Sequence, residues 1–407
     1  SLAIAKSGQT IYENSIGYAS LEDNLKINSD TICRIGSISK VFTTVMIFQL
    51  IEEGKLSLET SLAEYYPKVK NADKITINNL LNHSSGIFNF TNAPSFMTFM
   101  VETKSKNEMI TLIEGLDSDF EPGTSSNYSN SAFVLLGFII EDITKSSYSD
   151  QVDKRIIDKL KLKLTAYGGK IDPKANEAFS YEYRGNSWFK SKIESDMSVP
   201  GGAGAMVSTP KDLNIFIQAL FNGKLISQKS LDQMKTIEKG YGKGLFAIPF
   251  KQRSAYGHGG AIDFFKSNLA YFENEKIAIA FTANGATQST NDILLGVLSI
   301  LFNDPFELPK ANEKPIELSD EILTKYIGTF SSQSPQLALK IVLRVANNAL
   351  QAQATGQGPL SLVAFSETEF RFAQAGIVIK FEEVDGKVDY ANFSLVQGGG
   401  TFKFKRD

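Results

Sequence analysis

A serine followed three positions later by a lysine is the first pattern in this chain that could do chemistry. The Ser-x-x-Lys spacing occurs three times, at Ser37–Lys40, Ser187–Lys190 and Ser208–Lys211. Such a pair can act as nucleophile and base, because a lysine that is kept neutral can take the proton of the serine hydroxyl. Chance alone gives about this many copies in a chain of this length and composition. The spacing by itself therefore predicts nothing.

Sequence context distinguishes the copy at Ser37 from the other two. Ser37 follows Gly36 and opens a predicted amphipathic helix that extends to Glu53, with Gly54 where a helix should end. On this helix Lys40 lies one turn beyond Ser37 on the same face. The helix N-terminus carries a positive partial charge, which favours both a developing oxyanion and a deprotonated lysine. We expect Ser37 to be a nucleophile and Lys40 its base; the alternative is a serine that only caps the helix.

A second pattern, Tyr-x-Asn, also occurs three times, at Tyr12–Asn14, Tyr128–Asn130 and Tyr390–Asn392. Only the second copy follows a turn, Glu121–Thr124, and leads into a strongly apolar helix predicted over Asn130–Thr144. A junction between a turn and a helix can direct a phenol and an amide into one cleft. The sequence therefore predicts an acid or base at position 128, whereas the alternative is a tyrosine that hydrogen-bonds at a helix start.

The third pattern is His258-Gly259-Gly260, followed by Ala261 and a predicted strand. Two consecutive glycines let the backbone of another molecule approach closely, because they carry no side chains. His258 could then hydrogen-bond a carboxylate or an oxyanion of a substrate. We expect this segment to contribute to a binding site.

The scarcity of histidine and cysteine excludes several classes of site. The 407 residues include only two histidines, His83 and His258, and one cysteine, Cys33. No disulfide can form within the chain, and neither a four-cysteine nor a three-histidine zinc site can be built. We expect no metal and no cofactor. His83 is predicted to bond a loop and Cys33 to be buried and inert; a Cys33 nucleophile paired with His83 is the alternative.

Composition excludes further functions. The 42 Lys and Arg residues are balanced by 45 Asp and Glu residues, giving a net charge of −3. This balance argues against nucleic-acid binding, which depends on many contacts between basic side chains and phosphates. No apolar run reaches the roughly 18 residues that a membrane span needs. The chain also contains no G-x-S-x-G, P-loop, H-E-x-x-H or C-x-x-C motif.

Regular elements must position these residues. A Ser7-Gly8 turn predicts a β-hairpin at the start of the chain. Thr209, Pro210 and Asp212 form the signature of a helix start. Further predicted elements are two neighbouring strands, 267–272 and 276–282, and helices over 75–82 and 292–302.

The last quarter of the chain has a different pattern. Residues 304–318 are rich in proline and charge and are predicted to be a linker. After a short helix over 319–326, apolar residues alternate at period two, which is typical of antiparallel strands. We therefore expect two domains, over 1–303 and 319–407, the second a small antiparallel barrel.

The order of the three patterns carries a resemblance. Ser37–Lys40, then Tyr128–Asn130, then His258–Gly260 resembles the serine β-lactamase-like family, which includes class C β-lactamases, D-alanyl-D-alanine carboxypeptidases and esterases. The residues after Lys314, with Tyr326–Phe330 near their start, are similar to the lipocalin-like barrel appended to many members. The resemblance implies an α+β fold: an antiparallel sheet flanked by helices, an all-helical lobe, and a small β-barrel domain.

The resemblance also implies roles for individual residues. Ser37 would attack a carbonyl carbon and Lys40 would take its proton, while Tyr128 would relay that proton to the leaving group. Asn130 would bond the amide side chain of the substrate. The backbone N–H groups of Ser37 and Ala261 would form the oxyanion hole.

One departure from the family pattern affects the expected activity. Typical β-lactamases have Lys-Thr-Gly where this chain has His258-Gly259-Gly260. A lysine there is a fixed cation for a carboxylate, whereas a histidine with an ordinary pKa near 6.5 is mostly neutral at pH 7. Efficient β-lactamase activity is thus put in doubt, but acyl-enzyme chemistry is not.

We therefore expect a serine acyl-enzyme hydrolase that cleaves D-amino-acid peptides, amides or esters. The alternatives are a class C-type β-lactamase and a non-catalytic protein that binds cell-wall fragments or peptides on the same fold. The expected partner is a small-molecule or peptide substrate, with neither nucleic acid nor a transmembrane segment involved. The family implies a periplasmic or secreted location, and the sequence does not predict the oligomeric state.

Overall fold

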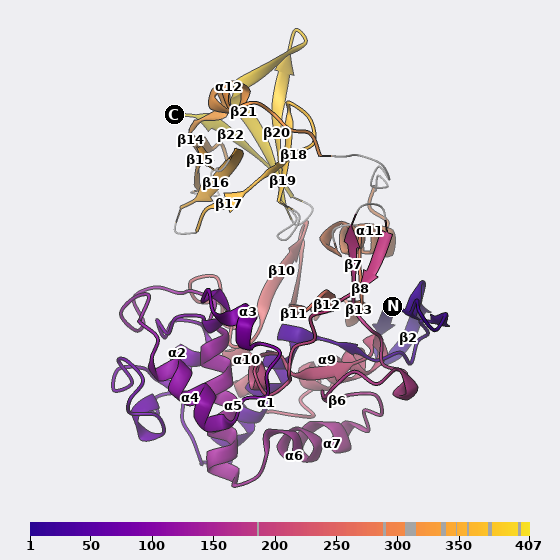
Figure 1. Ribbon diagram of the computed structural model, residues 1–407, viewed down its shortest axis with the longest axis vertical. Helices are drawn as coiled ribbons and strands as arrows, with labels where there is room; N and C mark the ends of the chain where they lie inside the picture. Colours follow the sequence, from indigo (N-terminus) through magenta and orange to yellow (C-terminus); the bar gives the residue numbers. More distant parts are fainter. Residues whose placement is uncertain are drawn as a thin grey trace. The chain divides into compact units, whose positions relative to one another are not determined.

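The chain divides into two compact units in a computed structural model (Figure 1). The N-terminal unit comprises residues 1–248 and 254–286, and the C-terminal unit comprises residues 249–253 and 287–407. The structure describes residues 1–184, 187–287, 290–305, 315–334, 339–346, 348–355, 358–372, 377–397 and 400–407. Residues 306–314 of the predicted linker lie outside these ranges, so the domain boundaries drawn from the sequence remain a prediction.

A six-stranded antiparallel sheet organises the N-terminal unit, in the order β10-β11-β12-β13-β1-β2. The predicted opening hairpin is confirmed, because β1 pairs with β2 across the Ser7-Gly8 turn. The predicted neighbouring strands are β12 and β13, which pair along their full length. The strands are β1 (Leu2–Lys6), β2 (Gln9–Asn14), β10 (Phe246–Phe250), β11 (Arg253–Ile262), β12 (Phe265–Phe272) and β13 (Ile277–Ala283).

Four helices of the N-terminal unit carry, or lie next to, residues that the sequence singled out. They are α1 (Ser39–Glu52), α5 (Asn130–Thr144), α8 (Gly201–Gly204) and α9 (Pro210–Phe221). The predicted start of α9 is confirmed, since Thr209 Oγ1 accepts a hydrogen bond from the Asp212 N–H at 3.3 Å. The prediction that α1 is amphipathic is wrong. All residues from Ser39 to Leu50 are buried, because α5, α6 (Tyr148–Val152), α8 and α9 pack around α1.

Short elements complete the N-terminal unit. The helices α2 (Ile77–Leu81), α3 (Phe96–Phe99), α4 (Lys106–Glu114), α6 (Tyr148–Val152), α7 (Asp158–Leu160) and α10 (Gln228–Lys235) belong to it. Its small strands are β3 (Tyr18–Ser20), β4 (Leu25–Lys26), β5 (Cys33–Arg34), β6 (Ala166–Tyr167), β7 (Tyr181–Arg184), β8 (Ser187–Lys190) and β9 (Met206–Ser208). One large apolar cluster joins α1, α2, α5 and α9 to the sheet.

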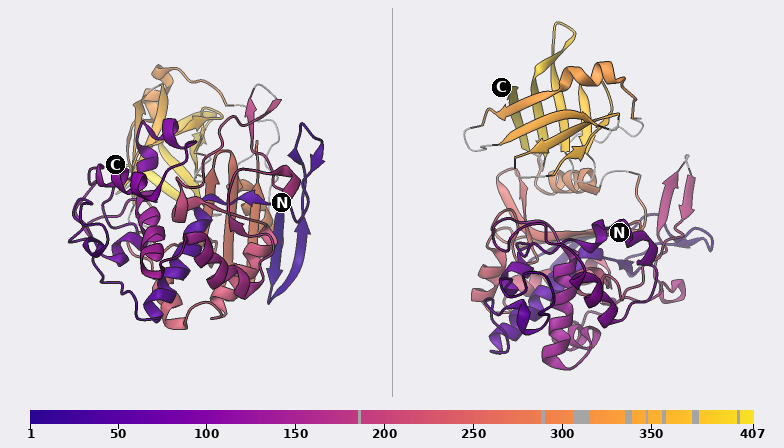
Figure 2. Two further views of the ribbon diagram at one scale, coloured as in Figure 1. Left: turned by 60° about the horizontal axis from the view of Figure 1, so that its bottom comes forward. Right: turned by 60° about the vertical axis from the view of Figure 1, so that its left-hand side comes forward.

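The C-terminal unit contains a nearly closed nine-stranded antiparallel barrel (Figure 2). Its strand order is β17-β16-β15-β14-β22-β21-β20-β19-β18, so that β17 and β18, adjacent in the sequence, end the order on either side. The strands are β14 (Gly328–Ser332), β15 (Lys340–Ala346), β16 (Ala349–Ala354), β17 (Leu360–Ser361), β18 (Val363–Ala364), β19 (Glu369–Phe372), β20 (Ile377–Val384), β21 (Lys387–Gln397) and β22 (Gly400–Arg406). Two helices, α11 (Thr290–Leu301) and α12 (Asp320–Leu323), belong to the same unit.

Aromatic side chains fill the barrel interior. Phe381 lies within 4.8–6.1 Å, between ring centroids, of Tyr326, Phe330, Phe370 and Phe393. All five side chains are buried. The period-two apolar pattern of the sequence thus corresponds to strands whose inward faces form one core.

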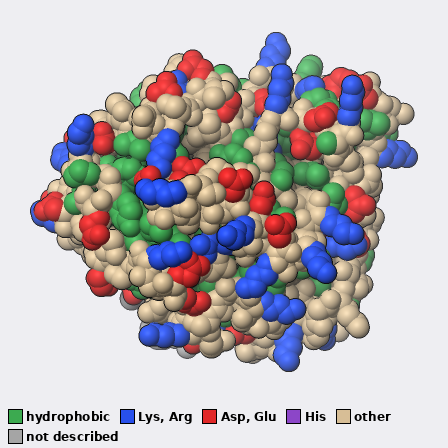
Figure 3. Space-filling model, turned by 90° about the horizontal axis from the view of Figure 1, so that it is seen from below, with side chains coloured by type: hydrophobic (Ala, Val, Ile, Leu, Met, Phe, Trp, Pro, Cys, Tyr) green, Lys and Arg blue, Asp and Glu red, His purple; other side chains and the backbone are tan. Residues whose placement is uncertain are grey.

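The surface carries both signs of charge. On the face shown in Figure 3, Lys and Arg side chains are interspersed with Asp and Glu side chains, as the near balance of 42 basic and 45 acidic residues leads one to expect. Within the described ranges, no helix combines the length and apolar character needed to cross a membrane.

Candidate active site

Ser37 lies in a single 3-10 turn, Gly36–Ile38, that leads directly into α1. Gly36 has a φ of +49°, a left-handed conformation that glycine adopts readily. A Cβ atom at position 36 would lie only 2.8 Å from the carbonyl oxygen of Ala261. Glycine is therefore required here, because the turn that carries Ser37 packs directly against the backbone of β11.

Lys40 is fully buried beside Ser37, as its place one turn further along the helix predicts. Its Nζ lies 3.1 Å from Ser37 Oγ, 2.7 Å from Asn130 Oδ1 and 2.8 Å from the carbonyl oxygen of Ala203. Burial lowers the pKa of Lys40 well below its usual value near 10.5. A neutral amine has two N–H groups, which match the two acceptors at Asn130 and Ala203. Its lone pair is then free to accept the Ser37 hydroxyl proton.

Tyr128 lies beside Lys40. Lys40 Nζ lies 4.8 Å from the centroid of the Tyr128 ring. Burial raises the pKa of Tyr128 above its ordinary value near 10, although the Ser37 hydroxyl acts in the opposite direction. Tyr128 is therefore a protonated phenol at neutral pH, and it can donate a hydrogen bond.

On strand β11, Gly260 precedes Ala261 and packs against Ile35, which lies two residues before Ser37. A Cβ atom at Gly260 would lie 2.0 Å from the carbonyl oxygen of Ile35, so only glycine fits. Ser267, which is opposite Gly260 on β12, donates a hydrogen bond to that same carbonyl at 2.8 Å. The two backbone segments that the resemblance assigns to the oxyanion hole thus lie side by side.

His258 is buried on β11, and its two ring nitrogens have different surroundings. Nδ1 lies 2.5 Å from the carbonyl oxygen of Gly259. A carbonyl can only accept, so Nδ1 carries the hydrogen and Nε2 a lone pair, for which the described residues provide no partner. Burial lowers the pKa of His258 to about 3. His258 is thus neutral at pH 7 and presents a hydrogen-bond acceptor at Nε2.

An aromatic cluster that sequence reasoning missed surrounds Tyr128 and His258. Tyr241 and Phe246 lie 6.5 Å and 6.4 Å from the Tyr128 ring, measured between centroids, and Phe246 lies 4.7 Å from His258. The ring of His83 lies 4.5 Å from Tyr128. These rings exclude water from the phenol, which is the physical cause of its raised pKa.

Residues expected to be structural have structural contacts. His83 Nδ1 accepts a hydrogen bond from the Ser129 N–H at 3.2 Å, so it holds the loop that precedes α5. Cys33 is buried, and burial raises the pKa of its thiol to about 11. The other Ser-x-x-Lys copies lie apart from this group: Ser187–Lys190 is the exposed strand β8, and Lys211 is exposed on α9.

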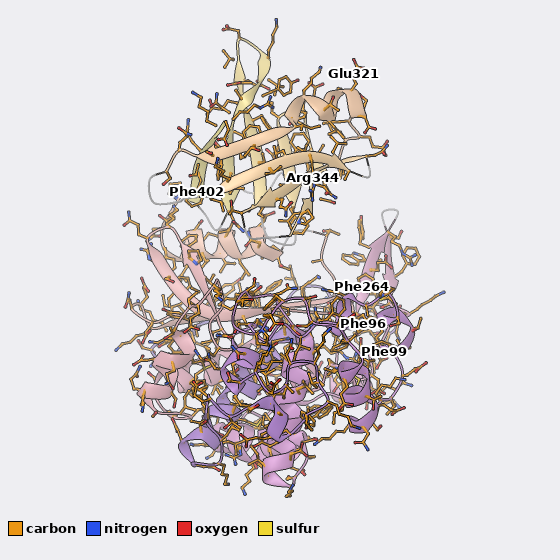
Figure 4. The ribbon with its side chains drawn as sticks, turned by 90° about the vertical axis from the view of Figure 1, so that its left-hand side faces the viewer. Phe96, Phe99, Phe264, Glu321, Arg344 and Phe402 are labelled. Carbon is orange, nitrogen blue, oxygen red and sulfur yellow. The ribbon has the colours of Figure 1, made fainter. Side chains whose placement is uncertain are left out.

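A cavity of about 420 Å³ opens beside Ser37. Ser37, Asn130 and Ala261 form part of its wall. Most of the remaining wall is apolar and includes Phe90, Phe96, Met97, Met100, Ile193 and Phe264. Phe96 and Phe264 lie on the same side of the N-terminal unit in Figure 4. The cavity can therefore hold an apolar group next to a carbonyl that reaches Ser37.

A buried ion pair also went unnoticed in the sequence. Arg34 Nη1 donates to Asp263 Oδ2 at 2.8 Å, and the two side chains are 2% and 0% exposed. Arg34 precedes Ser37 by three residues, and Asp263 follows Ala261 by two. The pair thus joins the segment that carries the serine to the hairpin that carries Ala261. Among the described residues, no cluster of three or more His, Cys, Asp or Glu side chains could hold a metal ion.

Solved structures of known proteins share this fold. D-amino acid amidase from Ochrobactrum anthropi SV3, complexed with L-phenylalanine, matches 74% of this chain and 93% of its own, with 26% identity and a TM-score of 0.67. D-stereospecific amidohydrolase from Streptomyces matches 70% of this chain and 88% of its own, with 28% identity and a TM-score of 0.61. The octameric penicillin-binding protein homologue from Pyrococcus abyssi matches 99% of this chain and 95% of its own, with 22% identity and a TM-score of 0.68, which shows the fold alone.

Sequence comparison agrees with the structural one. Penicillin-binding protein 4* of Bacillus subtilis is 26% identical over 93% of this chain and 88% of its own length. The Beta-lactamase family model matches residues 1–298, which is more than half of the 407 residues. The chain therefore belongs to the Beta-lactamase family of serine hydrolases.

Proposed function

We propose that this protein cleaves amides, peptides or esters through a covalent acyl intermediate on Ser37. The observation that carries the proposal is the contact between Ser37 Oγ and Lys40 Nζ at 3.1 Å, with Lys40 buried and its pKa lowered. A neutral lysine at this position is a base that needs no histidine. Tyr128, whose ring centroid lies 4.8 Å from Lys40 Nζ, is proposed as a second group for proton transfer.

The proposed reaction has two halves. Ser37 Oγ attacks the carbonyl carbon while its proton passes to Lys40 Nζ, and the N–H groups of Ser37 and Ala261 stabilise the negative oxygen. The bond to the leaving group then breaks, and the leaving group takes up a proton through Tyr128. Water next attacks the acyl carbon, loses its proton to the same residues, and releases the acid and free Ser37. Asn130 holds Lys40 and is placed to bond the substrate beside the serine.

His258 is proposed to bind the leaving-group side of the substrate. As an acceptor at Nε2, it suits an N–H or O–H donor and cannot donate a hydrogen bond to a carboxylate while it stays neutral. Gly259 and Gly260 are proposed to leave room for the substrate backbone next to it. This argues for amide or ester substrates over a class C-type β-lactamase reaction, in which a cation would hold the carboxylate.

D-amino-acid peptides and amides are the proposed substrate class. The support comes from solved relatives at 26–28% identity that are described as a D-amino acid amidase and a D-stereospecific amidohydrolase. The name of the relative Penicillin-binding protein 4* supports binding of β-lactams as well. A periplasmic or secreted location is proposed from the same relatives.

Replacement of the serine tests the proposal. In Ser37→Ala, hydrolysis of a p-nitrophenyl ester and labelling by a fluorescent penicillin should both be lost, because no other group can form the acyl bond. The matched control is Ser187→Ala, which removes the exposed serine of another Ser-x-x-Lys copy and should leave both signals unchanged. Undiminished turnover by Ser37→Ala would disprove the proposed function.

A further inference from the structure

We propose that the cavity beside Ser37 selects substrates whose acyl group is apolar and uncharged, and discriminates against acyl groups that carry a free α-ammonium. The inference rests on the proposed function, because it assigns the acyl group of the Ser37 ester to this cavity. The inference narrows the proposed substrate class. Within D-amino-acid derivatives in general, it favours substrates whose α-nitrogen is acylated, as within a peptide, and it extends to acyl groups that have no α-nitrogen.

The composition of the cavity wall is the first observation. Nine of the residues that line it are large apolar side chains or proline, among them Phe90, Phe96, Met97, Ile193 and Phe264. Of its lining residues, all within the described part of the chain, only Asp263 is charged. An α-ammonium in this cavity would therefore have a single candidate counter-charge.

The second observation is that Asp263 is already fully engaged. Its Oδ2 accepts from Arg34 Nη1 at 2.8 Å, and its Oδ1 accepts from the Ser195 hydroxyl at 2.6 Å and the Ser195 N–H at 3.2 Å. The Asp263 side chain is 0% exposed. Arg34 is also bound to Glu194, at 3.2 Å, but Glu194 does not line the cavity. Both Asp263 oxygens are thus already bound within the fold, in an ion pair with Arg34 and in hydrogen bonds from Ser195.

The third observation assigns the cavity to the acyl group. Ser37, Asn130 and Ala261 line it, whereas Lys40, Tyr128 and His258 do not. Tyr128 is the proposed donor to the leaving group, so the leaving group lies on the side of Ser37 where that phenol is found. The acyl group therefore enters the apolar cavity.

An ammonium group that enters an apolar cavity without a partner loses its hydration and gains no hydrogen bond. The cost of moving an unpaired charge out of water is large enough that the group instead gives up its proton. A free amine substrate should thus react mainly in its neutral form, whereas an uncharged acyl group enters without this penalty.

The test compares two substrates that share the phenyl ring and the leaving group. 3-Phenylpropanoyl 4-nitroanilide has no α-nitrogen, and D-phenylalanine 4-nitroanilide has a free one. At pH 6 we expect kcat/KM for the first to exceed that for the second by at least about tenfold. The difference should narrow as the pH rises through the pKa of the α-amino group, near 7.7–8.0 in peptides. N-acetyl-D-phenylalanine 4-nitroanilide should behave like the uncharged substrate at every pH.

A variant pair tests whether the acyl group occupies the cavity. Met97 lines it and is 57% exposed, so a polar residue there should be tolerated. Met97→Asp supplies a free carboxylate and should raise kcat/KM for the D-phenylalanine substrate, relative to the uncharged one, by up to about fivefold. Asparagine has nearly the same shape as aspartate but no charge, so Met97→Asn should leave the ratio unchanged.

The outcomes separate the inference from the proposed function. If D-phenylalanine 4-nitroanilide is cleaved as fast as the uncharged substrate at pH 6, or if Met97→Asp does not change the ratio, the inference is overturned while the acyl-Ser37 mechanism stands. If Ser37→Ala cleaves the substrates as fast as the wild-type protein, the proposed function fails whatever the ratio. If the wild-type protein cleaves none of the three anilides, the inference is overturned, whereas the proposed function is still decided by the ester and penicillin measurements on Ser37→Ala.

Discussion

At the scale of single residues, burial decides the chemistry of this site. Among the described residues, Lys40 Nζ has no carboxylate partner; it contacts the Ser37 hydroxyl, the amide oxygen of Asn130 and the backbone carbonyl of Ala203. A lysine without a counter-charge in a buried position is held neutral, because the charged form loses its hydration without compensation. Burial also disfavours the charged form of a phenol, which is the deprotonated form, so Tyr128 stays protonated. In the proposed mechanism, these two groups serve as the base and the acid that act on the Ser37 hydroxyl and the leaving group.

Removal of the amine should separate catalysis from folding. Lys40→Met keeps a side chain of similar length in the apolar surroundings but deletes the base, so acylation should slow by about 10²–10⁴-fold. The measurement is the rate of acyl-enzyme formation in a stopped-flow experiment, with thermal unfolding recorded in parallel. Lys211→Met, in another Ser-x-x-Lys copy and exposed, is the matched control and should keep the wild-type rate. A wild-type rate in Lys40→Met would show that the base lies elsewhere.

The buried histidines predict how stability changes with pH. Burial lowers the pKa of His258 to about 3 and also lowers that of His83 well below 6.5. In the unfolded chain both bind a proton near pH 6.5, so between about 3 and 6.5 the unfolded state holds more protons than the folded state. The free energy of unfolding should therefore fall as the pH is lowered below about 6.5.

Urea unfolding at pH 7.5 and pH 5.0 measures this effect. His258→Gln removes one of the two groups, so the loss of stability between the two pH values should be smaller in this variant than in the wild-type protein. An equal or larger loss in His258→Gln would contradict the assignment of a neutral, buried His258.

At the scale of elements, two close backbone approaches hold the serine turn against β11. Gly36 meets the backbone of Ala261, and Gly260 meets the carbonyl of Ile35. The Arg34–Asp263 ion pair and the Ser267 hydrogen bond fix the same two segments. The elements thus hold the backbone segments of Ser37 and Ala261 side by side, as the proposed oxyanion hole requires.

A comparison of two glycines with similar left-handed conformations tests this packing. Gly36 and Gly54 flank α1, with φ values of +49° and +70°. Alanine should cost roughly 1–2 kcal/mol of stability at either site, because both are left-handed. Only at Gly36 does a Cβ atom meet backbone, since the space around Gly54 is open. Gly36→Ala should therefore lose at least about tenfold in kcat, which corresponds to about 1.4 kcal/mol of lost transition-state stabilisation. Gly54→Ala should keep the wild-type kcat.

Equal kcat values in the two variants would show that the separation of the turn from β11 has no influence on catalysis. Thermal unfolding of both proteins supplies the control: Gly36→Ala should lose more stability than Gly54→Ala, because only its Cβ atom meets backbone, and kcat is compared at a temperature where both variants are folded.

At the scale of the whole molecule, the sequence predicted the fold better than it predicted the cavity. Local patterns, such as the Ser7-Gly8 turn, the Thr209 cap and the alternation of apolar residues after position 339, identify elements because their causes lie within a few residues. The amphipathic prediction for α1 was wrong because neighbours on every side bury it, and those neighbours come from distant parts of the chain.

The missed residues of the site have the same explanation. Asp263, Tyr241 and Phe246 lie more than 200 residues from Ser37 in the sequence, and no motif or spacing marks them. Arg34 lies near the serine, yet its partner becomes apparent only when β11 is folded against the serine turn. Motifs therefore identified the proposed reacting groups, whereas the groups that set the environment of the site required the structure.

The most direct test of the account is to locate the covalent bond. The protein is mixed with a slowly hydrolysed β-lactam or an activated ester, denatured in acid, and digested for mass spectrometry. The account predicts one acyl group per chain, on the peptide that contains Ser37, and none in the Ser37→Ala variant. An acyl group on any other residue, such as Cys33 or Ser187, or an adduct that persists in Ser37→Ala, would contradict it.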